Sequence, residues 1–275
     1  MSNAEIIARM NEGLPGRPGV AVSVRGVSHR FGAGPTGLAL DDISLDVRAG
    51  EMLCLLGPSG CGKSTLLSIM GGLTAPSAGE VWVGGARLVG PRPRTIAFVF
   101  QESVLFPWNS VIRDMEIALE FHGVPKRERR ARAMEALEAV GMADFANHMP
   151  GELSGGMKQR VALASALSLQ TDILLMDEPF AALDEQTRMI LGEDLSLLLS
   201  RTGKTILFVT HSLSEAVYLA DRVAVMTARP GRIKAMVDID EPHPRVPDFM
   251  TAPHFSEFRN ELYLLLRDEI RRAVR

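Results

Sequence analysis

The chain has 275 residues, of which 46% are hydrophobic and 23% charged, and its formal net charge is −3. This is the composition of a globular protein with a sizeable core, and it gives no overall attraction to nucleic acid. No apolar run approaches the roughly 20 residues needed to span a bilayer, and residues 1–18 lack the apolar stretch of a signal peptide. We therefore expect a cytoplasmic protein that reaches a membrane only through a partner.

The predicted elements follow a glycine- and proline-rich leader, which we expect to be loose over residues 1–19. Alternating apolar positions then predict strands, with one helix after the third of them. The strands begin near Val20 and continue over Leu40–Val47, Glu51–Leu56, Glu80–Val83 and Thr95–Phe100, and the helix is Ser64–Met70. From about residue 102 to 169 the apolar period becomes helical, over Ile112–Phe121, Lys126–Val140 and Ser154–Leu169.

Strands and helices alternate again after this block. The predicted strands are Asp172–Met176, Thr205–Val209, Arg222–Met226 and Arg232–Val237, and the helices are Glu185–Arg201 and Ser214–Leu219. This alternation predicts an α/β fold, in which helices cover a largely parallel sheet and the block at 102–169 is an inserted helical subdomain. Residues 241–247 are interpreted as a proline-rich linker. Residues 255–275 are predicted to form an amphipathic helix that packs on its own domain or makes a dimer or regulatory contact.

The segment from Gly57 to Thr65 fits the phosphate-binding pattern G-x-x-x-x-G-K-[ST]. An apolar strand leads into it and a helix leaves it, which is the structural setting that this loop requires. Its glycines allow backbone N–H groups to converge on one anion, and the helix N-terminus adds partial positive charge. Lys63 would reach the β- and γ-phosphates of a nucleotide, and Ser64 would ligate Mg²⁺.

Two acidic residues, Asp177 and Glu178, end the apolar strand that begins at Ile173. In a P-loop protein, the first acid holds Mg²⁺ through its water shell, and the second stands where it can polarise an attacking water. Taken alone, two acids at a strand end are as easily an exposed turn. The P-loop earlier in the chain favours the functional interpretation.

A second phosphate-binding helix start is predicted at Leu153-Ser154-Gly155-Gly156-Met157. Ser154 is a natural N-cap, and capping alone would explain it. Two glycines in the first turn cost helix propensity, so capping does not explain them. They permit an anion to approach the backbone closely.

Together these motifs resemble those of ATP-binding-cassette nucleotide-binding domains, over roughly residues 20–240, with 241–275 left as linker and C-terminal helix. The resemblance implies a P-loop NTPase (RecA-like) core with an antiparallel β subdomain and an inserted α-helical subdomain at about 102–169. It also implies that ATP and Mg²⁺ bind between the P-loop of one copy and the signature motif of a second, head-to-tail copy, and that the ATP is hydrolysed there.

The resemblance also implies individual roles. Phe31 would stack on adenine, unless it is an ordinary core residue; Gln101 would sense the γ-phosphate; Asp184 belongs to the D-loop; and His211 would lie at the γ-phosphate. The implied nucleotide-binding residues are Phe31, Gly57, Ser59, Gly60, Cys61, Gly62, Lys63, Ser64, Thr65, Ser154, Gly155, Gly156 and Asp184. The implied metal ligands are Ser64, Gln101 and Asp177, and the implied catalytic residues are Glu178, His211 and Gln101. Met157 departs from the pattern, because the signature usually carries Gln there.

Two segments, Phe106–Val111 and Asp177–Asp184, are similar to the importer cassettes of this family. Ala220–Ile233 and the LSGGM-type signature at Leu153–Met157 are similar to its nitrate, sulfonate and taurine branch. This resemblance implies a second cassette, transmembrane permease subunits and, indirectly, a periplasmic solute-binding protein as partners, at the cytoplasmic face of the inner membrane and without nucleic acid. The alternative is a soluble cassette ATPase of DNA repair or translation, which predicts a long coiled-coil insertion or two cassettes in one chain. The solute is not encoded in these motifs.

Two local features carry further expectations. The apolar cluster Leu105–Trp108 lines a cleft for a short helix of the membrane subunit, or else it packs inside the helical block. Cys61 lies near a helix N-terminus and Lys63, which predicts a lowered thiol pKa and alkylation that bound nucleotide prevents.

Overall fold

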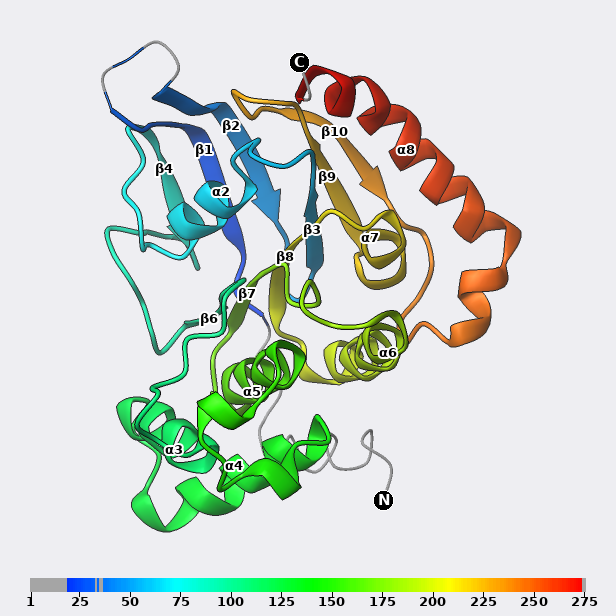
Figure 1. The fold of residues 1–275 in the computed structure, drawn as a ribbon. Coiled ribbons are helices and arrows are strands. Elements are labelled where there is room, and N and C mark those ends of the chain that lie inside the picture. Colours follow the sequence, from blue (N-terminus) through cyan, green and yellow to red (C-terminus); the bar gives the residue numbers. More distant parts are fainter. Residues whose placement is uncertain (1–18, 33, 35–36, 274–275) are drawn as a thin grey trace.

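The computed structural model describes residues 19–32, 34 and 37–273, so the predicted leader lies outside the described residues except for Gly19. Within these residues the chain forms two sheets and a separate group of helices (Figure 1). The larger sheet has the order β10-β9-β3-β8-β7-β6. Its strands are β3 (Met52–Leu56), β6 (Ile96–Val99), β7 (Ile173–Asp177), β8 (Thr205–Thr210), β9 (Arg222–Met226) and β10 (Ile233–Asp238).

The centre of the larger sheet is parallel, and only β10 runs antiparallel to its neighbour β9. Every residue of β3, β7 and β8 is buried, as expected for strands that are covered on both faces. The register aligns Leu56 with Thr210 and Asp177 with Val209. The loops that follow these three strands therefore emerge side by side at one edge of the sheet.

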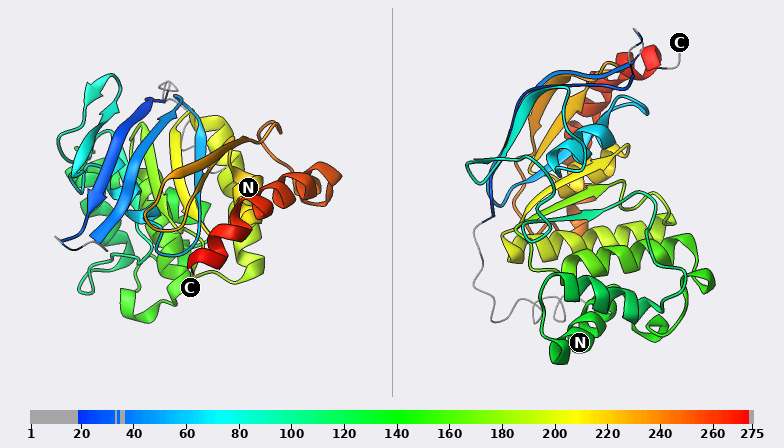
Figure 2. Two further views of the ribbon diagram at one scale, coloured as in Figure 1. Left: turned by 90° about the horizontal axis from the view of Figure 1, so that it is seen from above. Right: turned by 90° about the vertical axis from the view of Figure 1, so that its left-hand side faces the viewer.

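The smaller sheet is antiparallel, in the order β2-β1-β4-β5. Its strands are β1 (Val22–Arg30), β2 (Leu38–Val47), β4 (Ala78–Val83) and β5 (Ala86–Arg87). Buried residues alternate along β1 and β2, and the apolar face packs on α2 (Lys63–Met70) and on β3. Helix α2 thus lies between the two sheets (Figures 1 and 2).

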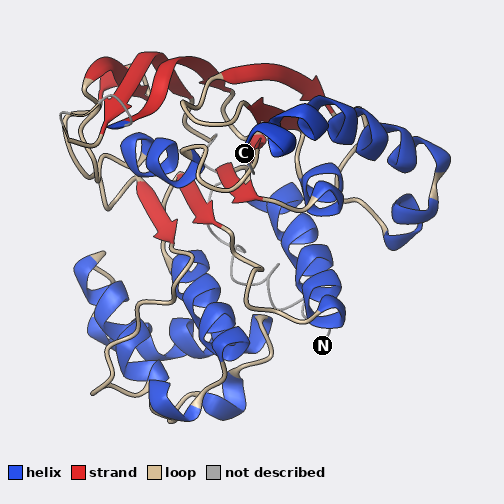
Figure 3. Ribbon diagram, turned by 45° about the horizontal axis from the view of Figure 1, so that its top comes forward, coloured by secondary structure: helices blue, strands red, loops and turns tan. Residues whose placement is uncertain are grey.

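Helices α3 (Val111–Phe121), α4 (Lys126–Ala139) and α5 (Gly155–Ser168) form the block between β6 and β7, with a hydrophobic core of their own. Figure 3 shows this block gathered at one side of the sheets. Residues 101–110, which begin the block in sequence, are irregular, and the first helix starts after Ser110. The opposite face of α5 joins the main core through Leu163 and Ala166, so α5 connects the two bodies.

Helices α6 (Glu185–Thr202) and α7 (Leu213–Leu219) cover the larger sheet, and α8 (Pro253–Ala273) runs along its outer side (Figure 2). Phe255, Leu262 and Leu266 of α8 are buried in the main core, so this helix packs on its own domain. The segment interpreted as a linker is held by the buried Arg245, whose Nη1 donates to Val217 O at 2.7 Å. Among the described residues, no helix is both long and apolar enough to cross a bilayer.

Candidate nucleotide site

A cavity of about 350 Å³ lies where the loop after β3 meets the ends of β6 and β7. It is lined by Phe31, Ala39, Ser59, Gly60, Gly62, Lys63, Ser64, Thr65, Gln101, Glu178 and Arg229. Segments from both sheets contribute, and the cavity carries two cationic side chains and one carboxylate. The structure therefore brings most of the predicted P-loop residues together with Phe31, Gln101 and Glu178.

The P-loop ends at Gly62, which is the N-cap of α2 and has a φ of 104°. Residues with a side chain rarely adopt this conformation, and a Cβ at this position would lie 2.7 Å from Leu40 Cδ2. Because glycine has no side chain to cap the helix, the first N–H groups of α2 are left for an anion in the cavity.

Lys63 is the first residue of α2, and its side chain is buried against the loop that precedes the helix. Its Nζ donates to the carbonyl oxygens of Gly57 and Pro58, both at 2.9 Å. These two bonds hold the ammonium at the wall of the cavity. Gly57 is buried and does not line the cavity, so its contribution is this carbonyl.

Ser64 and Asp177 form the part of the site that suits a divalent cation. Ser64 Oγ donates to Asp177 Oδ1 at 3.0 Å, which joins the start of α2 to the end of β7. Burial raises the pKa of Asp177, and the nearby charge of Glu178 adds to this, while the Ser64 hydrogen bond and Lys63 oppose it. The Ser64 hydroxyl and the Gln101 amide line the cavity, whereas the Asp177 carboxylate does not line it and reaches it through Ser64. These are the hard oxygen donors that Mg²⁺ prefers, so the residues fit that ion.

Glu178 follows Asp177 with a φ of 47°, a left-handed conformation that is uncommon for a residue with a side chain. Its backbone N–H donates to Val209 O at 3.0 Å, which fixes this turn against β8. Its Oε2 lies 3.4 Å from Nδ1 of His211, whose side chain is 60% exposed. The structure therefore pairs two of the three predicted catalytic side chains, of which Glu178 lines the cavity and His211 does not.

Behind this pair lies Glu215, which the sequence analysis did not single out. Its carboxylate accepts the hydroxyl of Thr210 and lies 3.5 Å from Nε of Arg188. Burial raises the pKa of Glu215, although the Thr210 hydrogen bond and Arg188 oppose the shift. This contact holds the strand end that carries His211.

Two hydrogen bonds connect the segment around Gln101 to helix α5. The buried Gln159 donates from Nε2 to Phe100 O at 3.2 Å, and Ser103 Oγ donates to Lys158 O at 3.0 Å. The backbone on either side of Gln101 is thus joined to the helix that carries the signature motif. Neither contact was predicted, because each joins residues more than fifty positions apart.

The signature motif lies elsewhere. Ser154 and Gly155 are exposed at the start of α5, and Ser154 Oγ caps the helix by accepting Met157 N–H at 3.3 Å. None of Ser154, Gly155 and Gly156 lines the cavity. Packing also favours glycine at position 156, since a Cβ there would lie 3.1 Å from Leu183 Cδ2.

Asp184 also lies outside the cavity. Its exposed carboxylate caps α6 by accepting Thr187 N–H at 2.9 Å, and this bond lowers the pKa of Asp184. The hydroxyl of the same Thr187 accepts Arg160 Nη2 of α5 at 3.0 Å, so the D-loop and the signature helix are tied together.

The expectation of a reactive Cys61 is wrong. Its side chain is 1% exposed, and burial raises the pKa of the thiol, which outweighs the opposing charge of Lys63. Cys61 does not line the cavity, so only its backbone is placed to contribute to the loop.

A parallel sheet with a glycine-rich loop, lysine and serine at the start of α2, and two acids at the end of the adjoining strand β7 defines a P-loop ATPase. The family model described as "ABC transporter" matches residues 40–181. The chain belongs to the ABC transporter family, and its fold is that of an ABC ATPase cassette.

Two curated proteins and one solved structure illustrate the similarity. An uncharacterised ABC transporter ATP-binding protein, MJ0412, of Methanocaldococcus jannaschii is 46% identical over 86% of this chain and 87% of its own length. The taurine import ATP-binding protein TauB of Rhizobium johnstonii is 42% identical over 88% of this chain and 94% of its own. The dimeric post-hydrolysis structure of the ATP-binding cassette MJ0796 with ADP and Pi has a TM-score of 0.74 and 32% identity, and covers 80% of this chain and 100% of that one.

Proposed function

We propose that this chain is the ATP-hydrolysing subunit of an importer for a small solute such as a sulfonate, taurine or nitrate. One observation carries the proposal: the P-loop cavity and the exposed signature helix are separate within one chain. Two head-to-tail copies would bring the signature of each onto the nucleotide of the other. The dimeric MJ0796 structure and the import function in the name of TauB support this proposal.

The residues in and around the cavity have separate roles in the proposed hydrolysis. The P-loop N–H groups and Lys63 bind the phosphates, while Ser64, Asp177 and Gln101 would hold Mg²⁺, which neutralises phosphate charge when bound. Glu178 orients the attacking water and accepts its proton, and His211 holds the γ-phosphate side of the site. Ser154, Gly155 and Gly156 of the second copy complete the phosphate contacts, with Asp184 beside them.

Partner subunits in the membrane would dock on the exposed aromatic cluster that follows Gln101. Trp108 is 71% exposed, and its ring stacks on Phe106 at 5.4 Å between centroids. Leu105 packs on the core of the helical block, whereas the two exposed rings do not need that packing and are available to a partner. The cluster lies beside the segment that Gln159 and Ser103 tie to α5, so a helix bound there is mechanically close to the signature motif. We place the subunit at the cytoplasmic face of the membrane on this basis.

Hydrolysis and self-association together test the proposal. The rate per chain is expected to rise with protein concentration, and Glu178→Gln with ATP and Mg²⁺ should sediment as a dimer, because ATP bridges two copies that cannot separate by hydrolysis. The Lys63→Ala/Glu178→Gln double variant is the control and should remain monomeric. A rate per chain that is independent of concentration, from a species that sediments as a monomer, would contradict the dimer mechanism.

Membrane docking is tested by Trp108→Ala in the full chain, expressed together with the permease subunit of the transporter. We expect ATP affinity to be unchanged and recovery with detergent-solubilised membranes to fall about tenfold. Phe121→Ala is the matched control, because Phe121 is an aromatic residue that is 81% exposed at the far end of α3. Equal membrane recovery for both variants would locate the docking surface elsewhere.

A further inference from the structure

The loop between β9 and β10 carries an arginine into the nucleotide cavity. Arg229 lines the cavity together with Phe31. Its Nε donates to Leu38 O at 3.1 Å, and its Nη2 lies 3.4 Å from Gly37 O. The same Gly37 carbonyl accepts the backbone N–H of Phe31 at 2.8 Å. One carbonyl therefore joins the two residues, and the guanidinium lies at the Phe31 end of the cavity.

This guanidinium suits the nucleoside part of a nucleotide. An arginine has five N–H donors, and the bonds to Leu38 and Gly37 use two of them. The others can donate to ring nitrogens of a purine or to ribose hydroxyls, which are acceptors, and the guanidinium plane can stack on a base. Phe31, which is 56% exposed, offers an aromatic face at the same end.

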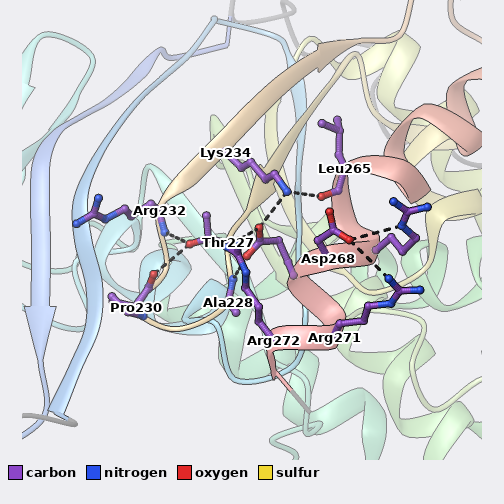
Figure 4. Close-up of polar contacts among 11 residues, drawn as sticks. Thr227, Ala228, Pro230, Arg232, Lys234, Leu265, Asp268, Arg271 and Arg272 are labelled. Carbon is purple, nitrogen blue, oxygen red and sulfur yellow. Dashed lines mark hydrogen bonds and ion pairs between the residues drawn. The ribbon is translucent and has the colours of Figure 1, made fainter. Parts of the chain in front are cut away.

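The C-terminal helix holds this loop from outside (Figure 4). Glu269 of α8 is 2% exposed, and its Oε2 accepts the N–H of Ala228, the residue before Arg229, at 3.1 Å. Its Oε1 accepts Lys234 Nζ at 2.9 Å, and Lys234 also donates to Leu265 O at 2.8 Å. A buried carboxylate that accepts a backbone N–H fixes the position of that peptide.

The inner side of the loop is fixed as well. Gly231 donates to Ala39 O at 2.8 Å and accepts Asp41 N–H at 3.0 Å, which joins the loop to β2. A Cβ at Gly231 would lie 2.2 Å from Cys61 O, so the loop rests directly on the P-loop backbone. Within the loop, Thr227 Oγ1 donates to Pro230 O at 3.0 Å (Figure 4). Arg229 is therefore presented by a loop clamped between α8 and the nucleotide site.

We propose that Arg229 binds the base and ribose of ATP beside Phe31, and that Glu269 of the C-terminal helix is the residue that positions it. The inference rests on the proposed binding of ATP in this cavity. It makes α8, which lies on the outer side of the sheet, a part of the nucleotide-binding apparatus.

The affinities of the full chain for MgATP and for magnesium tripolyphosphate, measured by calorimetry, test the proposal. Tripolyphosphate carries the phosphates without the nucleoside. Arg229→Ala is expected to weaken ATP binding about tenfold, the typical effect of losing a hydrogen bond from a charged group, and to leave tripolyphosphate binding unchanged. Arg232→Ala is the matched control on the same loop, because its guanidinium pairs with Asp41 outside the cavity, and it should change neither affinity.

The positioning role of Glu269 has its own test. Glu269→Gln is expected to weaken ATP binding about threefold, again without effect on tripolyphosphate, and to have no further effect when Arg229 is already alanine. Asp268→Asn is the control, because Asp268 pairs with Arg267 and with Arg271 of its own helix. Figure 4 shows the pair with Arg271. A Glu269→Gln effect that persists in the Arg229→Ala background would overturn the positioning role.

Two further outcomes separate this inference from the proposed function. If Arg229→Ala keeps the full ATP affinity, or loses ATP and tripolyphosphate equally, the nucleoside contact is wrong. If the native chain binds neither ligand, or if Lys63→Ala fails to weaken both, the cavity is not an ATP site and the proposed function itself fails.

Discussion

Helices α2 and α5 both begin with glycine-rich turns suited to an anion, but the two helix N-termini differ in their surroundings and in their capping. The start of α2 opens into a cavity that contains Lys63 and Ser64, and no side chain caps it. The start of α5 is capped by its own Ser154 and lies exposed, away from that cavity. The comparison indicates that a glycine-rich helix N-terminus makes a phosphate site within one chain only where the tertiary structure adds a cationic side chain and encloses a cavity. In the proposed head-to-tail dimer, the second start would meet the nucleotide of the other copy.

The largest expected effect separates the two starts by ATP binding to the dilute, monomeric chain. Lys63→Ala should weaken ATP affinity by about 100-fold, because it removes a charge in contact with the phosphates. Ser154→Ala should leave this affinity unchanged, because Ser154 does not line the cavity of its own chain and, in the proposed dimer, acts on the partner's nucleotide. Fluorescent-nucleotide titration measures both, and a loss of affinity in Ser154→Ala would show that the signature binds its own chain's ATP.

A smaller effect distinguishes the two signature glycines from each other. A Cβ at Gly155 has its nearest neighbour at 3.9 Å, whereas at Gly156 it would meet Leu183 Cδ2 at 3.1 Å and Ala182 O at 3.2 Å. Alanine gains the same helix propensity at either site, so Gly155→Ala should be more stable than Gly156→Ala by about 1 kcal/mol.

The same glycine substitution is also expected to affect ATP hydrolysis. Gly155→Ala should lower the rate about tenfold at concentrations where the dimer forms, because the methyl group blocks close approach of a phosphate. Urea unfolding and phosphate release are the measurements. Full activity of Gly155→Ala would show that no anion approaches the start of α5.

The far end of α5 provides a structural counterpart to its exposed start. Lys204 Nζ donates to Leu169 O at 3.1 Å and to Thr171 O at 2.6 Å, and burial lowers the pKa of Lys204 from 10.5 to about 8. Between these two values the unfolded chain binds more protons than the folded one, so this group contributes stability that rises with pH. Relative to Lys204→Met, the native chain should gain about 1 kcal/mol of unfolding free energy from pH 7 to pH 9.

The quantity to compare is the unfolding free energy of the native chain minus that of Lys204→Met at each pH. The raised pKa values of Cys54 and Cys61 act in the opposite direction above pH 8, and they are common to both proteins. An unchanged difference between pH 7 and pH 9 would mean that Lys204 titrates normally.

The smallest expected effect concerns the P-loop side of the comparison. Cys61 is as buried as Cys54, so neither thiol should react with iodoacetamide faster than about a tenth of the rate of free cysteine. Mass spectrometry of Cys54→Ser and Cys61→Ser identifies the labelled site. Rapid labelling at Cys61 in the chain without nucleotide would restore the reactive thiolate that the sequence suggested.

Most of the architecture could be predicted because each element has a strong local pattern. Strands β3, β7 and β8 are uninterrupted apolar runs, and the helix starts at Gly62 and Ser154 carry their own glycine and capping signals. The short strand β5 was missed, since two residues leave no periodic signal.

The sequence by itself determined the P-loop, the acids at the end of β7 and the signature motif, because the residues that define each motif are neighbours in the chain. Only the tertiary structure decided that Arg229 enters the cavity and that Glu269 holds its loop from α8. It also decided that the Cys61 thiol is buried and that its pKa is raised. These outcomes depend on strand order and on side chains brought together from distant segments, and burial there outweighs the local charges that the sequence displays.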